Sequence, residues 1–367
     1  MRSIFTLSTA DQYAILAISV FAELKFISIF SLLFGVGLAI QYERSLKSNT
    51  NFFPFVYRRL AALGAFGLAH AILLWFGDVL FTYACVGAIV VLGIGFSPKR
   101  LIVIAAILLP IGAAAVGLLS IVYHVPSVAN DELIFEKTYG LSAIAAANFE
   151  PTHPGFIAAE KLAHTDGPFV DAISFRLFNY LINLFIASIL CWLISAMFCI
   201  GVALWKSGFF NGRGPGVRWR KRLLLMGLLI GFPLEIVLGC VGEFSNSQAL
   251  IALTESIHML SAPLMALGIV SACVLLAEHS KLPGERYFAT VGRMSLTAYL
   301  LESLLFVFVT DWWGLALFGK LGPAALLLTS LLIYVAVLTF CTVWQILFKR
   351  GPMEQIWRSI SYMRLSA

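Results

Sequence analysis

The sequence predicts an all-α fold, a polytopic transmembrane helix bundle of about nine spans with an external segment of about 50 residues. Two observations support this class. Long apolar runs alternate with short basic loops between Arg44 and Arg364, and 60% of the residues are hydrophobic whereas only 12% are charged. Because a helix of about 20 apolar residues crosses the hydrocarbon core of a bilayer, each long apolar run has the length of one span.

The apolar runs define the expected spans to within a few residues. These are Phe26–Tyr42, Val56–Phe76, Val79–Phe96, Leu101–Tyr123, Phe178–Trp205, Leu223–Val241, Leu250–Glu278, Ala289–Thr310 and Leu321–Phe348. We expect residues 1–367 to form a single integral membrane domain, in which residues 124–175 are an extracytoplasmic, cap-like insertion. This insertion contains no cysteine and is too short to predict a stable independent domain.

The distribution of positive charge predicts the orientation of the spans. Of the 25 Lys and Arg residues, 19 lie in alternate loops, and the positive-inside rule places these loops in the cytoplasm. The loops are residues 43–59, 97–100, 206–222, 279–293 and 349–367. Nine alternating spans then put the N-terminus outside and the C-terminus inside. The net charge of +6 follows from this topology, so no nucleic-acid partner is expected.

Polar side chains inside the spans are the candidates for function, because a charged group in hydrocarbon is costly unless it faces protein or water. The first group is His70 with Asp78. If one helix continued through both, His70, Leu74 and Asp78 would share a face at i, i+4 and i+8. His70 is then a candidate general base or proton relay. The alternative is a neutral imidazole that only hydrogen-bonds neighbouring helices.

A second group lies between Arg293 and Glu302. Ser295, Tyr299 and Glu302 recur at i, i+4 and i+7, which predicts one polar stripe headed by Arg293 at the cytoplasmic end. The alternative is that these groups only join helices through hydrogen bonds. Other polar positions in or beside the spans are Arg176, Asn179, Asn183, Glu235, Glu255 and His258. Glu23 and Lys25 are expected to mark the outer boundary of the first span.

An ordered combination of segments resembles the YeiB family of bacterial inner-membrane proteins. The segments are Lys25–Gly37, Arg58–His70, Trp75–Ala84, Gly292–Leu300 and Arg350–Arg358, so the resemblance covers nearly the whole chain. It implies a location in the bacterial inner membrane. Through a distant similarity of the family to membrane acyltransferases, it also implies transfer of an acyl group from a cytoplasmic donor to an acceptor across the membrane.

Two departures from the family pattern are visible. Family members usually open with an additional helix that carries an Asp and an Arg-Gly pair, and no equivalent precedes Asp11. Glu302 stands where a Gln is common in the family. If the additional helix supplies catalytic groups, the present chain lacks them.

A transmembrane acyltransferase would divide the candidate residues into three roles. The catalytic residues are His70 as general base and Tyr299 or Ser295 as donors to the carbonyl oxyanion. The donor-binding residues are Arg58, Arg59 and Arg293, which would hold the phosphates of acyl-CoA, with no covalent cofactor and no metal. A small-molecule or lipid-linked acceptor would contact Asp78, Glu302, Asn179, Asn183, Glu255 and His258.

Two other classes of function remain open at this point. A transporter of a small solute or lipid-linked molecule would use Glu235, Glu255, His258 and Glu302 as proton or substrate sites. Pro233 and Pro263 interrupt apolar spans, as in many transporters, although the sequence shows no internal repeat. A non-catalytic membrane scaffold would use the same polar residues only to lock helices together.

Labelling of introduced cysteines tests the predicted topology. In a background that lacks the six native cysteines, Ser127→Cys should react with a membrane-impermeant maleimide from outside. Gly214→Cys should react only after the membrane is permeabilised, because its loop carries the Arg218–Arg222 basic cluster. Equal labelling of both positions from outside would overturn the orientation.

Overall fold

The computed structural model describes residues 8–123, 154–245, 247–278, 284–348 and 350–362. Every regular element in these ranges is a helix, which confirms the all-α fold class. The helices are α1 (Thr9–Phe21), α2 (Lys25–Lys47), α3 (Phe52–Leu73), α4 (Leu80–Val90), α5 (Pro98–Tyr123), α7 (Pro154–Thr165), α8 (Phe169–Lys206), α9 (Val217–Met226), α10 (Phe232–Phe244), α11 (Gln248–Glu278), α12 (Glu285–Arg293), α13 (Ser295–Thr310), α14 (Pro323–Leu347) and α15 (Pro352–Tyr362). A 3₁₀ turn (Val91–Gly93) extends α4, and a π-helical turn (Gly227–Gly231) joins α9 to α10.

Six helical segments in the described part of the chain are long and apolar enough to cross a membrane, which makes the chain an integral membrane protein. They are Thr9–Lys47, Pro98–Ile121, Phe169–Lys206, Val217–Phe244, Ala249–Glu278 and Pro323–Leu347. The pair α12 and α13 adds a seventh if it is counted as one broken span, since its two helices meet at 87°. The predicted nine spans are therefore not confirmed.

The difference between the predicted and the observed number of spans has a separate cause in each helical region concerned. Helix α3 has 22 residues, but it contains Arg58, Arg59 and His70 and is not among the segments apolar enough to cross a membrane. Helix α4 has only 11 residues, which is too short for a span. The predicted span Ala289–Thr310 is divided at Met294, where α12 ends and the chain turns sharply into α13.

The first span is also longer than the predicted one. The chain continues from α1 into α2 across residues 22–24, where Leu24 has a positive φ of 56°. Lys25, just after this break, is fully buried. The prediction that Glu23 and Lys25 mark an outer boundary is therefore wrong, because the apolar helical path extends on both sides of them.

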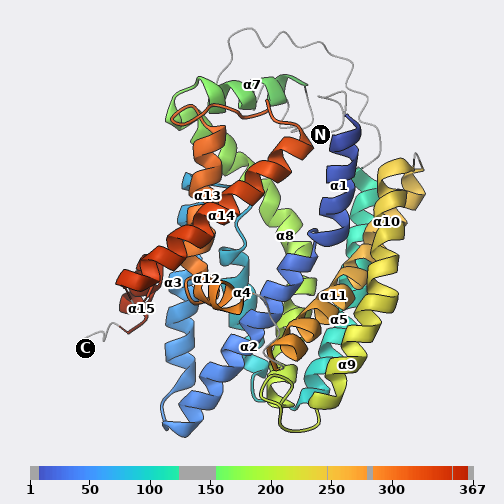
Figure 1. Ribbon diagram of the computed structural model, residues 1–367, viewed down its shortest axis with the longest axis vertical. Coiled ribbons are helices and arrows are strands. Elements are labelled where there is room, and N and C mark those ends of the chain that lie inside the picture. Colours follow the sequence, from blue (N-terminus) through green and yellow to red (C-terminus); the bar gives the residue numbers. More distant parts are fainter. Residues whose placement is uncertain (1–7, 124–153, 246, 279–283, 349, 363–367) are drawn as a thin grey trace.

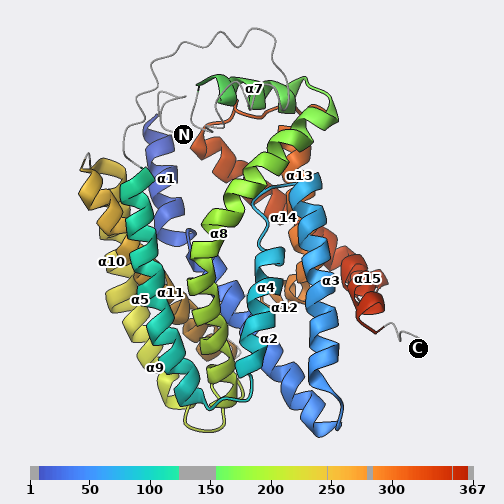
Figure 2. The same ribbon diagram turned by 180° about the vertical axis from the view of Figure 1, so that it is seen from behind.

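Helix α8 is the central element of the bundle and packs against α2, α3, α4, α5 and α7. Figures 1 and 2 show α5, α9, α10 and α11 on one side of it and α3, α13 and α15 on the other, while α14 runs obliquely across the bundle and begins in contact with α1. Helix α7 lies across the end of the molecule at which α1 begins. Residues 124–153, most of the predicted insertion, lie outside the described residues.

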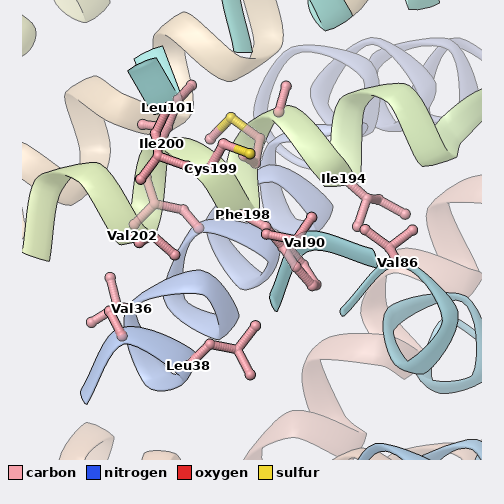
Figure 3. Close-up of a cluster of buried hydrophobic side chains, with 14 of the residues drawn as sticks. Val36, Leu38, Val86, Val90, Leu101, Ile194, Phe198, Cys199, Ile200 and Val202 are labelled. Atoms are coloured by element: carbon pink, nitrogen blue, oxygen red, sulfur yellow. The ribbon is translucent and has the colours of Figure 1, made fainter. Parts of the chain in front are cut away.

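The main core forms where α2, α4 and α8 meet. Phe198 of α8 stacks on Phe34 at 4.8 Å between ring centroids and meets the Tyr83 ring edge-on at 5.3 Å. Figure 3 shows Phe198 and Val90 of α4 in the same cluster of buried apolar side chains. A Cβ on Gly201 would lie only 2.0 Å from a backbone oxygen of α2, so a residue with no side chain is needed at this crossing. The core fixes α4, and with it the loop that precedes α4.

Candidate functional site

His70 lies in a buried chain of hydrogen bonds that joins α3, α13 and the loop between α3 and α4. Its Nδ1 is 3.0 Å from Asp78 Oδ1, and its Nε2 is 2.8 Å from Ser303 Oγ. The exposed fractions of His70, Asp78 and Ser303 are only 3%, 2% and 6%. The Asp78 carboxylate orients the His70 imidazole, and this imidazole is placed to take the proton of the Ser303 hydroxyl group.

Tyr299, which lies one turn before Ser303 on α13, contacts both His70 and Asp78. Its ring centroid is 4.8 Å from that of His70, and its hydroxyl donates to Asp78 Oδ1 at 3.3 Å. The structure therefore brings the predicted His70, Asp78 and Tyr299 together. Tyr299 orients the carboxylate here, whereas the sequence predicted that it would contact a substrate oxyanion.

Asp78 reaches His70 by a route that differs from the predicted one. Helix α3 ends at Leu73, so no single helix carries both residues, and the condition for an i, i+8 relation is not met. The chain turns back instead, and Asp78 Oδ2 accepts a hydrogen bond of 2.8 Å from the Phe81 N–H in the first turn of α4. The carboxylate thus satisfies one of the unpaired N–H groups at the start of that helix.

Gly67, which lies one turn before His70 on α3, leaves the space that the Asp78 carboxylate and the start of α4 occupy. A Cβ on Gly67 would lie 2.4 Å from the Phe81 nitrogen and 2.6 Å from Asp78 Oδ2. Both separations are far below van der Waals contact. The position of Asp78 therefore depends on the missing side chain.

The loop between α3 and α4 is held by side chains from two other helices. From α8, Arg176 donates to the Leu73 carbonyl oxygen at 2.9 Å, and Asn183 donates to the Phe76 carbonyl oxygen at 3.2 Å. The indole of Trp75 stacks on Phe306 of α13 with 5.6 Å between centroids. Asn183 was predicted to bind substrate, but in this structure it fixes the loop that carries Asp78.

A second buried cluster ties α7 and α8 to the end of α13. Arg176 pairs with Asp311, whose other oxygen lies 3.0 Å from His164 Nδ1. Next to them, Asn179 of α8 donates to Glu160 of α7 at 2.6 Å. Burial raises the pKa of the Glu160 carboxyl above its usual value, which is partly offset by the charge of His164. The cluster anchors α7 across the end of the bundle.

A third buried cluster lies where α2, α10 and α11 meet. Lys25 pairs with Glu235 and donates to the Ser19 carbonyl oxygen at 2.6 Å. Glu235 also lies 2.9 Å from His258 Nδ1 and accepts a hydrogen bond of 2.5 Å from Ser261. His258 Nε2 is buried without a hydrogen-bond partner in the described part of the chain. This cluster shares no residue with the site around His70.

The remaining predicted residues lie elsewhere. Ser295, Tyr299 and Glu302 all lie on α13, where their spacing puts them on one face as predicted. Ser295 is exposed at the first residue of this helix, and Glu302 is half-buried. Arg293 donates to Gln345 at 3.0 Å. Arg59 lies 4.0 Å above the Trp357 ring of α15, whereas Arg58 is exposed. The described contacts do not join these cations into one cluster.

Ser303 and Asp311 were not predicted from the sequence as functional residues, and the burial of Lys25 was not predicted either. Ser303 follows Glu302 directly and lies at i+4 from Tyr299, so the signal was a second hydroxyl on the Tyr299 face of the helix. Among the described residues, no group of three or more His, Cys, Asp or Glu side chains is arranged to hold a metal ion.

Fold and site together define a helical integral membrane protein with a buried carboxylate–imidazole–hydroxyl group. The family model described as "Protein of unknown function (DUF418)" matches residues 204–364, which include Tyr299 and Ser303 but not His70. The uncharacterized protein YxaH of Bacillus subtilis is 28% identical over 97% of this chain and 84% of its own length. The uncharacterized protein YeiB of Escherichia coli is 26% identical over 96% of this chain and 85% of its own length. The chain is therefore YeiB-like, as its motifs predict. No solved structure matches it.

Two separate glycine-to-alanine substitutions test the packing of the site. Gly67→Ala should lower the stability of the purified protein by about 1–3 kcal/mol, because the added methyl group must displace Asp78 or Phe81. Gly37→Ala is the matched control, since a Cβ there would meet nothing within 4 Å. It should be neutral or slightly stabilising, as Ala favours helix over Gly. Thermal unfolding in detergent measures both, and equal melting temperatures would contradict the packing argument.

Proposed function

We propose that the protein is a membrane acyltransferase, which moves an acyl group from a cytoplasmic acyl-CoA-type donor to a small-molecule or lipid-linked acceptor at or across the membrane. The observation that supports this proposal is the buried Asp78–His70 pair, with His70 Nε2 directed at a hydroxyl group. Acyl transfer needs a base at the attacking hydroxyl or amine, and a neutral imidazole held by a carboxylate supplies one near pH 7.

The roles of the two residues follow from the geometry. If Nδ1 of His70 donates to Asp78, the lone pair is on Nε2, which is the form that accepts a proton. Asp78 then stabilises the imidazolium that forms as the nucleophile attacks the thioester carbonyl. The proton passes from His70 to the leaving sulfur, and free CoA is released. Tyr299 and the Phe81 N–H keep Asp78 in the required orientation.

Tyr180 of α8 is the group that we assign to the developing oxyanion. Its hydroxyl is buried without a hydrogen-bond partner in the described part of the chain, and its side chain interacts electrostatically with Asp78. A buried donor without a partner is uncommon in folded proteins and favours a ligand atom as its partner during the reaction. Ser295, which was predicted for this role, is exposed.

The phosphates of the donor would lie at the opposite end of α3 from Asp78. At a rise of 1.5 Å per residue, Arg59 and His70 are about 16 Å apart along α3. The arm of the acyl-CoA donor that joins its phosphates to the thioester must therefore span this distance. Arg58 and Arg293 remain the other cations proposed for this end. Arg59 already contacts the Trp357 ring of α15, which gives its guanidinium a fixed position.

Replacement of His70 tests the proposed function. His70→Gln should lower the rate of CoA release from acetyl-CoA or palmitoyl-CoA on the order of 10²–10⁴-fold, since the general base is lost. The assay uses the full chain in liposomes of bacterial lipid extract, which supply acceptors. Ser330→Ala on α14 is the control and should keep the native rate. Equal rates for His70→Gln and the native protein would defeat the proposal.

The alternative function is proton-coupled transport, and the buried Lys25–Glu235–His258 cluster favours it. A lysine, a carboxylate and an imidazole in contact inside a membrane bundle are the usual components of a proton site. The π-helical turn just before α10 adds an irregular backbone segment of the kind found at functional sites.

Replacement of Glu235 separates transport from a purely structural role of this cluster. Glu235→Gln should abolish small-molecule accumulation driven by a pH gradient in vesicles, and it should destabilise the protein by about 3–5 kcal/mol because it leaves Lys25 buried without a counter-charge. Lys25→Met/Glu235→Gln should recover most of that stability. If the double variant also regains native function in either assay, the cluster is structural and the transport alternative fails.

A further inference from the structure

We propose that Ser303 carries the acyl group covalently, so that the transfer proceeds through an acyl-serine intermediate. This inference rests on the proposed function and adds the nucleophile to it. A direct transfer needs the acceptor hydroxyl at His70 Nε2. That place is taken by a hydroxyl of the protein itself, since Ser303 Oγ lies 2.8 Å from Nε2.

The hydrogen bonds of Ser303 distinguish it from the ordinary hydroxyl residues in the other helices. A serine or threonine in a helix usually donates to the carbonyl oxygen four residues earlier. Ser271, Thr329 and Ser330 do so at 2.7, 2.8 and 2.9 Å. The corresponding distance from Ser303 to the Tyr299 oxygen is 3.3 Å, whereas the distance to His70 Nε2 is 2.8 Å. The Ser303 hydroxyl is therefore placed to give its proton to the imidazole.

The complete arrangement satisfies the geometric requirements for an activated serine. The nucleophile is within hydrogen-bond distance of the base, and the base is within hydrogen-bond distance of the carboxylate that orients it. Asp78 in turn accepts from Phe81 and Tyr299, so the orientation is held by groups on α4 and α13. All members are buried, which keeps water away from a reactive ester.

The reaction consists of two balanced steps. Ser303 Oγ attacks the thioester carbonyl carbon, its proton passes to His70 Nε2, and the carbon–sulfur bond breaks as CoA leaves with that proton. The acceptor hydroxyl or amine then attacks the ester carbonyl and gives its proton to His70, and Ser303 Oγ leaves as the proton returns to it. Donor and acceptor therefore never need to occupy the site together. The acyl group can enter from one end of the bundle and leave toward another.

Trapping the intermediate tests this inference directly. The detergent-purified full chain is mixed with acetyl-CoA or palmitoyl-CoA in the absence of acceptor, and intact-protein mass and released CoA are measured. We expect a single added acyl group, assigned by peptide mapping to Ser303. Ser303→Ala and His70→Gln should reduce this acylation on the order of 100-fold or more, whereas Ser330→Ala should leave it unchanged.

A cysteine variant guards against a simple folding defect. Ser303→Cys keeps a nucleophile of similar size and should give a thioester that neutral hydroxylamine removes. If CoA release in liposomes continues in Ser303→Ala and no adduct forms in the native protein, the transfer is direct, so Ser303 is not a carrier although the proposed function stands. An adduct on a different residue also overturns the assignment. If neither CoA release nor an adduct occurs with either donor, the acyltransferase function itself is wrong.

Discussion

The need to neutralise buried charge is the constraint on which this bundle depends. A charged side chain that is removed from water is tolerated only with a partner and with its hydrogen bonds made. The structure meets this requirement at several separate places, among them those where Lys25 pairs with Glu235, Arg176 pairs with Asp311, and His70 is paired with Asp78. The first two pairs join elements that are distant in the sequence, and His70 reaches Ser303, which is equally distant, through its other ring nitrogen. The charged residues therefore fix which helices are neighbours, and the apolar surfaces fill the space between them.

Helix α8 connects two of these places. Arg176 contributes one hydrogen bond to the Leu73 carbonyl oxygen at the end of α3 and a salt bridge to Asp311 just after α13. The same side chain therefore sets the distance between the two helices that carry His70 and Ser303. Near the other end of these helices, α15 acts in a similar way. Glu354 accepts hydrogen bonds from the N–H groups of Leu296 and Thr297 at the start of α13, while the Trp357 indole donates to the Arg59 carbonyl oxygen on α3.

The sequence was sufficient to predict the fold class and part of the site, and the reasons for the limits are physical. Hydropathy identifies long apolar helices, so the all-α membrane fold follows from it. It cannot distinguish the short α4 or the sharp bend at Met294 from a complete span, because both depend on tertiary packing. His70, Asp78 and Tyr299 were found because charged and polar groups in apolar segments are unusual. Ser303 was not, since a serine in a helix needs no special partner. Lys25 was assigned to a boundary because its partner, Glu235, is 210 residues away.

The separation of the buried clusters has a consequence for how the protein uses its two sides. The cluster around Glu235 lies among α2, α10 and α11, whereas the His70 site lies between α3 and α13, with α8 packed against both α2 and α3. The two sides meet at α8 and at the core around Phe198. That core is closely packed, with Gly201 admitting no side chain at its crossing with α2. Close packing transmits a displacement instead of absorbing it. The buried charges on the α10 and α11 side therefore connect by close packing, through α2, to the helix that carries Arg176 and Asn183, although they touch none of the residues around His70.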